Sequence, residues 1–287
     1  MYLIINLLVF VITLFLYIHI YFQVKTSNYL EIYEVDNLSK DKLEELCDLK
    51  QPLVINDFKM LENMNYDILY SKYSDFDVKI KKKDDTIYLP IKLSALNDLF
   101  DGDMSNNYLC DNNEDFLQET TLVKEIEKED LFLRPYNVSM KQYNLIMGTT
   151  NSSSKLHYSL DCRNFFYILN GSVEVTLCAP NNYKYLYVNK NYEDLQFESS
   201  INIDDVQEIY KGGFSKIKFL WVTLTKNKLL QIPSYWFYSI KILEDNTLLS
   251  SFKYRSFMNS FAIIPHLLIH FLQNNNIKRI TTKILDK

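Results

Sequence analysis

The chain has 287 residues, of which 47% are hydrophobic and 15% aromatic, and this composition excludes a disordered protein because it can bury a core. The formal net charge of -5 excludes an electrostatic footprint for nucleic acid, so no nucleic-acid partner is expected. Four cysteines without a CxxC pair exclude a disulfide framework and a structural zinc site, and we interpret them as reduced thiols.

Residues 2–22 form an apolar run without a charged side chain. At about 1.5 Å rise per residue this run spans roughly 31 Å, the thickness of a hydrocarbon core, and it predicts one membrane-spanning helix. The alternative is a cleaved signal peptide. The segment has no basic start, exceeds the usual apolar length of a signal and is followed by no small-residue cleavage site, which favours a single-pass membrane anchor.

The far end of this run has the composition of a membrane interface. Tyr17, Tyr21 and Phe22 cluster there, and aromatic rings favour the boundary between lipid and water. His19 lies close enough to this end to reach water, so we interpret it as a boundary residue. The flanks contain few cations, which specifies the orientation poorly, and a cytosolic domain is favoured.

The segment after the anchor mixes helices and short strands. Ser39 is placed to cap a helix over residues 40–49, and the apolar residues 52–56 predict a strand. The alternating, then basic, residues 79–83 followed by two aspartates are typical of a solvated hairpin tip, and the acidic residues 111–130 favour helix.

From residue 132 the chain changes to short alternating apolar runs separated by turn residues, which predicts a β core. The turn Asn170-Gly171 between two such runs predicts a hairpin, because both residues accept positive φ. Eight short strands suit a jelly roll. We expect them at residues 142–147, 164–169, 172–178, 183–188, 217–223, 229–232, 238–243 and 248–254.

Residues 261–272 predict an apolar helix with Pro265 in its first turn, too short to cross a bilayer and suited to packing or to a homodimer contact. His266 and His270 share one face of it, and we interpret them as core or interface residues rather than metal ligands. The chain therefore divides into an anchor and flank (1–24), a helix and strand part (25–130), a β core (131–260) and a C-terminal helix and tail (261–287).

Three segments carry a family resemblance. They are Gln-Pro-Leu-Val-Ile at residues 51–55, a central region that contains Ser-Lys-Leu-His-Tyr-Ser at 154–159 and Asn-Phe-Phe-Tyr-Ile-Leu-Asn-Gly at 164–171, and Gln-Ile-Pro-Ser-Tyr-Trp-Phe-Tyr at 231–238. In this order and at these separations, residues 30–260 resemble the JmjC or cupin-8 family of Fe(II) and 2-oxoglutarate dependent oxygenases. The resemblance implies a mainly β fold with flanking helices, built around a double-stranded β-helix (jelly roll).

The resemblance also implies an incomplete iron site. The family's His-x-Asp and distal His correspond here to His157, Ser159 and Tyr238, so one of three metal ligands is retained. Ser159 carries no charge, and a phenol with a pKa near 10 is a poor ligand for Fe(II). The cosubstrate positions correspond to Ser154, Asn164 and Val173, where Val173 stands at a position that is often Lys in the family. No metal and no cofactor are therefore expected.

We interpret the chain as a membrane-anchored, non-catalytic module with a structural role or an unidentified protein partner. One alternative is an active protein hydroxylase or demethylase that binds Fe(II) and 2-oxoglutarate, in which a β-bulge turns Asp161 inward as a replacement ligand. Another is a metal-free cavity for a small ligand, lined by Tyr158, Phe166, Trp236 and Tyr238. We prefer a structural interpretation to an active site, in which the side chains of His157, Asn164, Trp236 and Tyr238 fill the barrel interior, hydrogen-bonded to one another.

Overall fold

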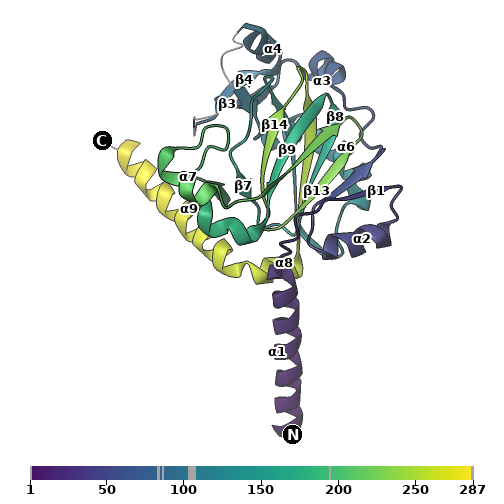
Figure 1. The fold of residues 1–287 in the computed structure, drawn as a ribbon, viewed down its shortest axis with the longest axis vertical. Coiled ribbons are helices and arrows are strands. Elements are labelled where there is room, and N and C mark those ends of the chain that lie inside the picture. Colours follow the sequence, from purple (N-terminus) through teal and green to yellow (C-terminus); the bar gives the residue numbers. More distant parts are fainter. Residues whose placement is uncertain (1, 83–84, 86, 103–107, 194, 286–287) are drawn as a thin grey trace.

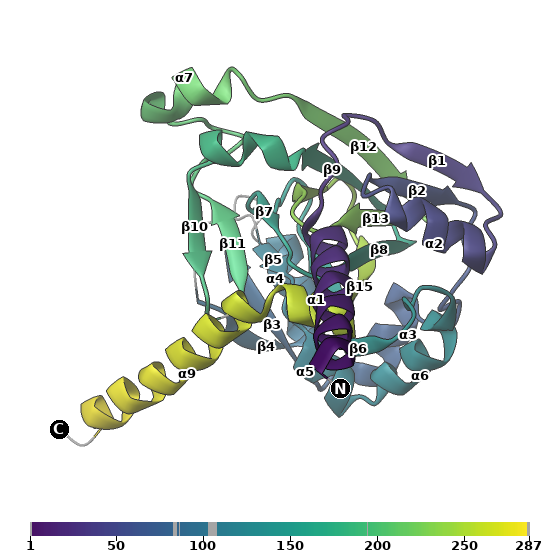
Figure 2. The same cartoon turned by 90° about the horizontal axis from the view of Figure 1, so that it is seen from below.

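A long helix projects from a domain made of two facing β-sheets. The computed structural model describes residues 2–82, 85, 87–102, 108–193 and 195–285. Helix α1 (Tyr2–Val24) stands away from the domain and meets it beside helix α8 (Phe257–Ala262), from which α9 (Ile264–Leu285) runs outward along one side (Figures 1 and 2). The single apolar helix predicted at the N-terminus is therefore present.

The larger sheet has nine strands in the described part of the chain. Its strands pair antiparallel, except for the parallel pair β1 and β2. In spatial order they are β1 (Tyr33–Asp36), β2 (Leu53–Asn56), β13 (Leu229–Pro233), β8 (Arg163–Asn170), β15 (Leu248–Ser256), β6 (Val138–Gly148), β5 (Tyr108–Cys110), β3 (Asp77–Lys82) and β4 (Leu89–Lys92).

The smaller sheet has six strands, all antiparallel, counted over the same described residues. In spatial order they are β10 (Val188–Asn191), β11 (Gln196–Ser199), β7 (His157–Tyr158), β14 (Phe237–Ile242), β9 (Ser172–Cys178) and β12 (Phe219–Thr225). From β6 to β9 and from β12 to β15 the chain alternates between the two sheets, which is the topology of a double-stranded β-helix. The predicted fold class, mainly β with flanking helices, is confirmed.

Helices cover the outer face of the larger sheet. Their buried side chains form one core with that face, and a second core fills the space between the two sheets. The covering helices are α2 (Lys40–Asp48), α3 (Tyr66–Tyr73), α4 (Leu93–Gly102), α5 (Glu114–Glu119) and α6 (Leu122–Glu129). As predicted, Ser39 caps α2, where its hydroxyl accepts a hydrogen bond of 3.3 Å from the main-chain N–H of Lys42.

Two local predictions in the β core are wrong. Residues 183–188 were expected to form a strand, but Pro180–Tyr185 forms a 3-10 helix and the strand begins only at Val188. Proline fixes φ and has no N–H to lose, so it begins a helical turn readily. The turn Asn170-Gly171 is not a hairpin either, because β8 and β9 belong to different sheets. Gly171, at φ +74°, instead turns the chain from one sheet to the other.

The C-terminal helix differs from the prediction in its limits. Residues 261–272 are divided between α8 and α9, with a break at Ile263, and α9 continues to Leu285. Pro265 lies in the first turn of α9, as predicted. The hairpin predicted at residues 79–85 is present as the antiparallel pair β3 and β4, although residues 83, 84 and 86 lie outside the described ranges.

The corner at Gly171 provides a test of the fold. In Gly171→Ala the new Cβ would lie 2.9 Å from the Cα of Thr247, and alanine would keep a positive φ. We expect the free energy of unfolding of the full chain in detergent to fall by more than about 1–2 kcal/mol, measured by urea denaturation. Gly212→Ala is the control, because its Cβ meets nothing within 4 Å, and its stability should change by less than about 1 kcal/mol. Equal stabilities would contradict the strained corner.

Candidate functional site

A cleft of about 490 Å³ opens at one end of the space between the two sheets. Strands β6, β7, β11 and β15 and helix α9 contribute its walls. The cleft contains the segment from His157 to Asp161, where the sequence places the iron-ligand positions. Its lining is mainly polar and includes Gln142, Asn144, His157, Tyr158, Ser159, Asp161, Glu198, Lys253, Arg255 and His270.

His157 and Tyr238 are brought together by pairing of β7 with β14. Their ring centroids are 4.2 Å apart. His157 Nδ1 lies 2.7 Å from the carbonyl oxygen of Lys155, and because a carbonyl only accepts, Nδ1 carries the proton and Nε2 keeps its lone pair. Burial lowers the pKa of His157, and the positive charge of Lys253 acts in the same direction, so the imidazole is neutral.

Tyr238, at the expected distal histidine position, is part of the barrel core. It is 2% exposed, and its ring centroid lies 5.2 Å from that of Phe166. Burial raises the pKa of Tyr238, and the charges of Asp161 and Asp111 raise it further. The phenol is therefore neutral at physiological pH, a form that binds Fe(II) poorly.

Ser159 and Asp161 are bonded to each other. The Ser159 hydroxyl donates to Asp161 Oδ2 at 2.9 Å and accepts from the Asp161 main-chain N–H at 3.1 Å. This local arrangement is a turn closed by a serine side chain, which uses the hydroxyl at the position of the family's carboxylate. Neither group is left free by this turn.

Asp161 is also paired with Arg255 at the end of β15. Asp161 Oδ1 accepts from Arg255 Nε at 2.9 Å and from Nη2 at 2.7 Å. The two side chains are 8% and 12% exposed, so each charge relies on the other for compensation. To bind a metal, Asp161 would have to release Arg255. The guanidinium would then be buried without this charged partner, which is unfavourable. Among the described residues, no group of three or more His, Cys, Asp or Glu side chains is arranged to hold a metal ion.

The three cosubstrate positions are also engaged within the chain. Val173 is fully buried in the core between the sheets and has no polar side-chain atom to pair with a carboxylate. The Ser154 hydroxyl accepts from the Ile240 main-chain N–H at 2.9 Å. Asn164 Nδ2 donates to the main-chain carbonyls of Asp161 at 3.3 Å and Ile232 at 3.1 Å. Of these three side chains, Ser154 lines the cleft.

The expected aromatic lining is largely replaced by polar residues. Tyr158 does line the cleft, but Phe166 and Trp236 lie in the packed core between the sheets. The expected mutual hydrogen bonds of the interior side chains are replaced by bonds to main-chain carbonyls. Trp236 Nε1, for example, donates to the carbonyl of Lys50 at 3.2 Å.

Lys253 and Arg255 were missed by reasoning from the sequence. Both lie on β15, where they alternate with Phe252 and Tyr254, which are buried in the core on the outer face of the larger sheet. Because side chains alternate along a strand, Lys253 and Arg255 must point to the opposite face, into the cleft, which we call the barrel mouth. This period of two was readable in residues 248–256, so the signal was present.

The two histidines of α9 behave as interface residues, and both contact the same tyrosine. His266 stacks on the Tyr192 ring with centroids 5.8 Å apart, and His270 Nδ1 lies 2.6 Å from the Tyr192 carbonyl oxygen. His270 also lines the cleft. These contacts hold one face of α9 against the loop that follows β10.

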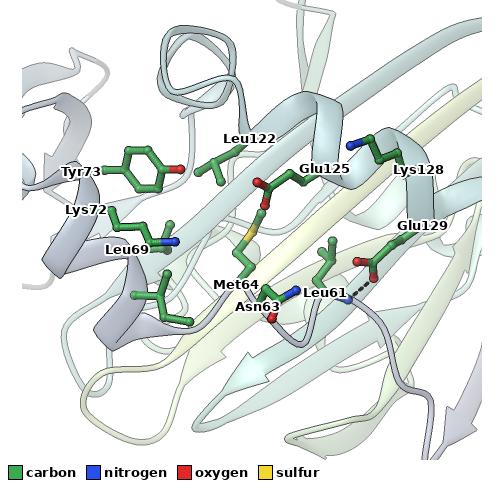
Figure 3. Close-up of a pocket in the computed structure, with 11 residues that line it drawn as sticks. Leu61, Asn63, Met64, Leu69, Lys72, Tyr73, Leu122, Glu125, Lys128 and Glu129 are labelled. Carbon is green, nitrogen blue, oxygen red and sulfur yellow. Dashed lines mark hydrogen bonds between the residues drawn. The ribbon is translucent and has the colours of Figure 1, made fainter.

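A second pocket, of about 410 Å³, lies between α3 and α6 (Figure 3). Its walls include Leu69 and Leu122, and Glu125 and Lys128 stand at its sides. Glu129 accepts a hydrogen bond from the main-chain N–H of Leu61 beside it. This pocket shares no lining residue with the barrel mouth, so it is separate from the candidate site.

The Asp161 and Arg255 pair can be tested by its contribution to stability. In Asp161→Ala the guanidinium loses its buried partner, so we expect the free energy of unfolding to fall by about 3–5 kcal/mol in urea denaturation. Lys211→Ala is the control, because its pair with Glu208 is 60% and 86% exposed and should contribute less than about 1 kcal/mol. Similar losses in the two variants would mean that Asp161 is not held by Arg255.

The comparison with known proteins agrees with this fold. A family model described as a cupin-like domain matches residues 39–260, which include α2 and every strand of the β-helix core. No curated protein matches the chain. Because the family match covers most of the chain and the two-sheet topology is that of a β-helix, the chain belongs to the cupin-like, JmjC-type domain family.

Proposed function

We propose that the chain is a membrane-anchored cupin-like domain that holds no catalytic iron and acts as a binding or structural module. The observation that carries the proposal is the state of Asp161, whose carboxylate is shared between Ser159 and Arg255. Iron of this family's type needs two imidazoles and one carboxylate on one face of the metal. The cleft offers His157 with a paired carboxylate, and the nearby phenol of Tyr238 is neutral and buried in the core, which is too weak a ligand set for Fe(II).

The anchor is part of the proposal. Helix α1 is described along its whole length, has no buried residue and contains a window with a mean hydropathy of 2.6. A helix that is apolar on all sides and uncovered by its own domain is stabilised by lipid, which removes its apolar surface from water. We further propose that the domain lies in the cytosol, since Cys47, Cys110, Cys162 and Cys178 are all free thiols.

A second candidate function is the binding of a small anionic ligand without metal. It is favoured by one observation, the position of Lys253 in the cleft beside a neutral His157. A cleft of about 490 Å³ has the size of a small-molecule site. In this form the chain remains a binding module, and its ligand is held by charge and hydrogen bonds rather than by an aromatic lining.

The absence of catalytic iron is tested by anaerobic titration of the full chain in detergent with Fe(II) and 2-oxoglutarate, followed by metal analysis. We expect the wild type and His157→Ala to be indistinguishable and to retain no stoichiometric iron, because a single imidazole binds Fe(II) weakly. Retention of one iron per chain that is lost in His157→Ala would overturn the proposal and support the alternative of an active oxygenase.

A gain-of-function variant gives the matched positive control for this titration. Ser159→Asp combined with Tyr238→His restores two imidazoles and a carboxylate, so we expect iron retention at about one per chain, lost again when His157→Ala is added. Near-ultraviolet circular dichroism of each variant checks that the barrel remains folded. Iron in the double variant alone would assign the loss of the metal to these two positions.

The anchor is tested by placing charge at its centre. An arginine near the middle of a spanning helix costs about 2.5–3.5 kcal/mol, so Val11→Arg combined with Leu14→Arg should prevent stable insertion. In cell membranes washed with alkaline carbonate, we expect the wild type in the pellet and the double variant in the supernatant. Release of the wild type, or a mature protein shortened by the mass of residues 1–24, would instead support a cleaved signal peptide.

A further inference from the structure

An exposed apolar surface lies on α8 and the first half of α9. From residue 257 to residue 272 the chain has no charged side chain. The exposed apolar side chains lie on both helices, on either side of the break at Ile263. They are Phe257 and Phe261 on α8 and Ile264, Leu268, Ile269, Phe271 and Leu272 on α9, each between 40% and 64% exposed.

This surface adjoins the end of α1 that enters the domain. Helix α1 packs against α8, and Figure 1 shows α8 beside the point where α1 meets the domain. The α1 residues that lose part of their exposure are His19, Ile20 and Gln23, in its last turns. A hydrocarbon core takes about 20 helical residues, so these last turns of α1 lie at the lipid headgroups if α1 spans the bilayer. Helix α8 then lies at the same depth.

The surroundings of α8 match that depth. Tyr136, 63% exposed, precedes Asn137, whose carbonyl accepts from the Phe257 main-chain N–H at 3.1 Å. Lys40 Nζ lies 5.8 Å from the centroid of the Tyr136 ring. On α1, the ring of Phe22 has Lys50 Nζ 4.9 Å from its centroid. Aromatic rings with lysine ammonium groups over them are typical of the boundary between lipid and water.

We propose that Tyr136, Phe257, Phe261, Ile264 and Leu268, here called the foot surface, insert into the lipid headgroup layer and seat the domain on the bilayer. The inference rests on the proposed function, because it requires α1 to span a membrane. Lipid is favoured over a protein partner because the surface continues directly from a lipid-facing helix and has no charged residue within 257–272 to form ion pairs. Burial of these side chains in the boundary region holds the domain in one orientation.

Insertion of the foot surface determines where the cleft lies relative to the bilayer. Arg255 of the cleft is two residues before Phe257 of the foot surface, and His270 of the cleft is two residues after Leu268. The barrel mouth therefore opens beside the membrane. A ligand or partner of the cleft is met at the bilayer surface, within reach of lipid headgroups, rather than in bulk solution.

The test measures the depth of tryptophans in the full chain reconstituted into phosphatidylcholine vesicles with brominated acyl chains, which quench tryptophan in or near the hydrocarbon. Trp221 is replaced by Phe in every variant to lower the background. Phe261→Trp probes the foot surface and Phe10→Trp probes α1. Leu89→Trp is the control, because Leu89 is 63% exposed on β4, at the end of the domain away from α1 (Figure 1).

We expect brominated lipid to lower the fluorescence of Phe261→Trp and Phe10→Trp by about twofold or more and to leave Leu89→Trp unchanged, with no effect of high salt because the surface is uncharged. Quenching of Phe10→Trp without quenching of Phe261→Trp would overturn the insertion of the foot surface into the headgroup layer, while the proposal that α1 spans the membrane would stand. Loss of quenching at Phe10→Trp would overturn the anchor itself. A full chain that changes from dimer to monomer in Phe257→Ser with Phe261→Ser, together with an unquenched Phe261→Trp, would assign the surface to a second copy.

Discussion

The buried carboxylate of Asp161 is the constraint on which the barrel mouth depends. A charge that is 8% exposed must be compensated, and Arg255 together with the hydroxyl of Ser159 provides this compensation. Arg255 lies near the end of β15, the strand between β6 and β8 in the larger sheet, so the pair ties the segment after β7 to the centre of that sheet. The same contacts that hold the mouth together therefore withdraw the carboxylate from metal chemistry.

A second set of contacts joins the barrel core to helix α1. Trp236, two residues before Tyr238, donates to the main-chain carbonyl of Lys50, and the Lys50 ammonium lies over the ring of Phe22 on α1. Lys50 is 7% exposed, and burial lowers its pKa. These contacts, together with the packing of α1 on α8, hold the end of α1 against the domain.

Much of the fold was predictable from periodicity, because alternating apolar residues mark strands whatever their partners. The pattern could not tell a hairpin at Asn170-Gly171 from a corner between two sheets, since both need a tight turn between alternating runs. Less of the site was predictable. The positions of His157 and Tyr238 follow from the resemblance, whereas the commitment of Asp161 to Arg255 joins residues 94 apart in the sequence, and no local pattern specifies such a pair.

The side chains at the expected iron and cosubstrate positions share one physical effect. Val173 packs in the core at the expected lysine position, Tyr238 adds a buried ring at the expected distal histidine position, and Ser159 closes a local turn at the expected carboxylate position. In each case the side chain is engaged by contacts within the chain, and these contacts stabilise the folded barrel. The barrel interior then acts as a structural core. This core positions the polar cleft and the foot surface beside α1.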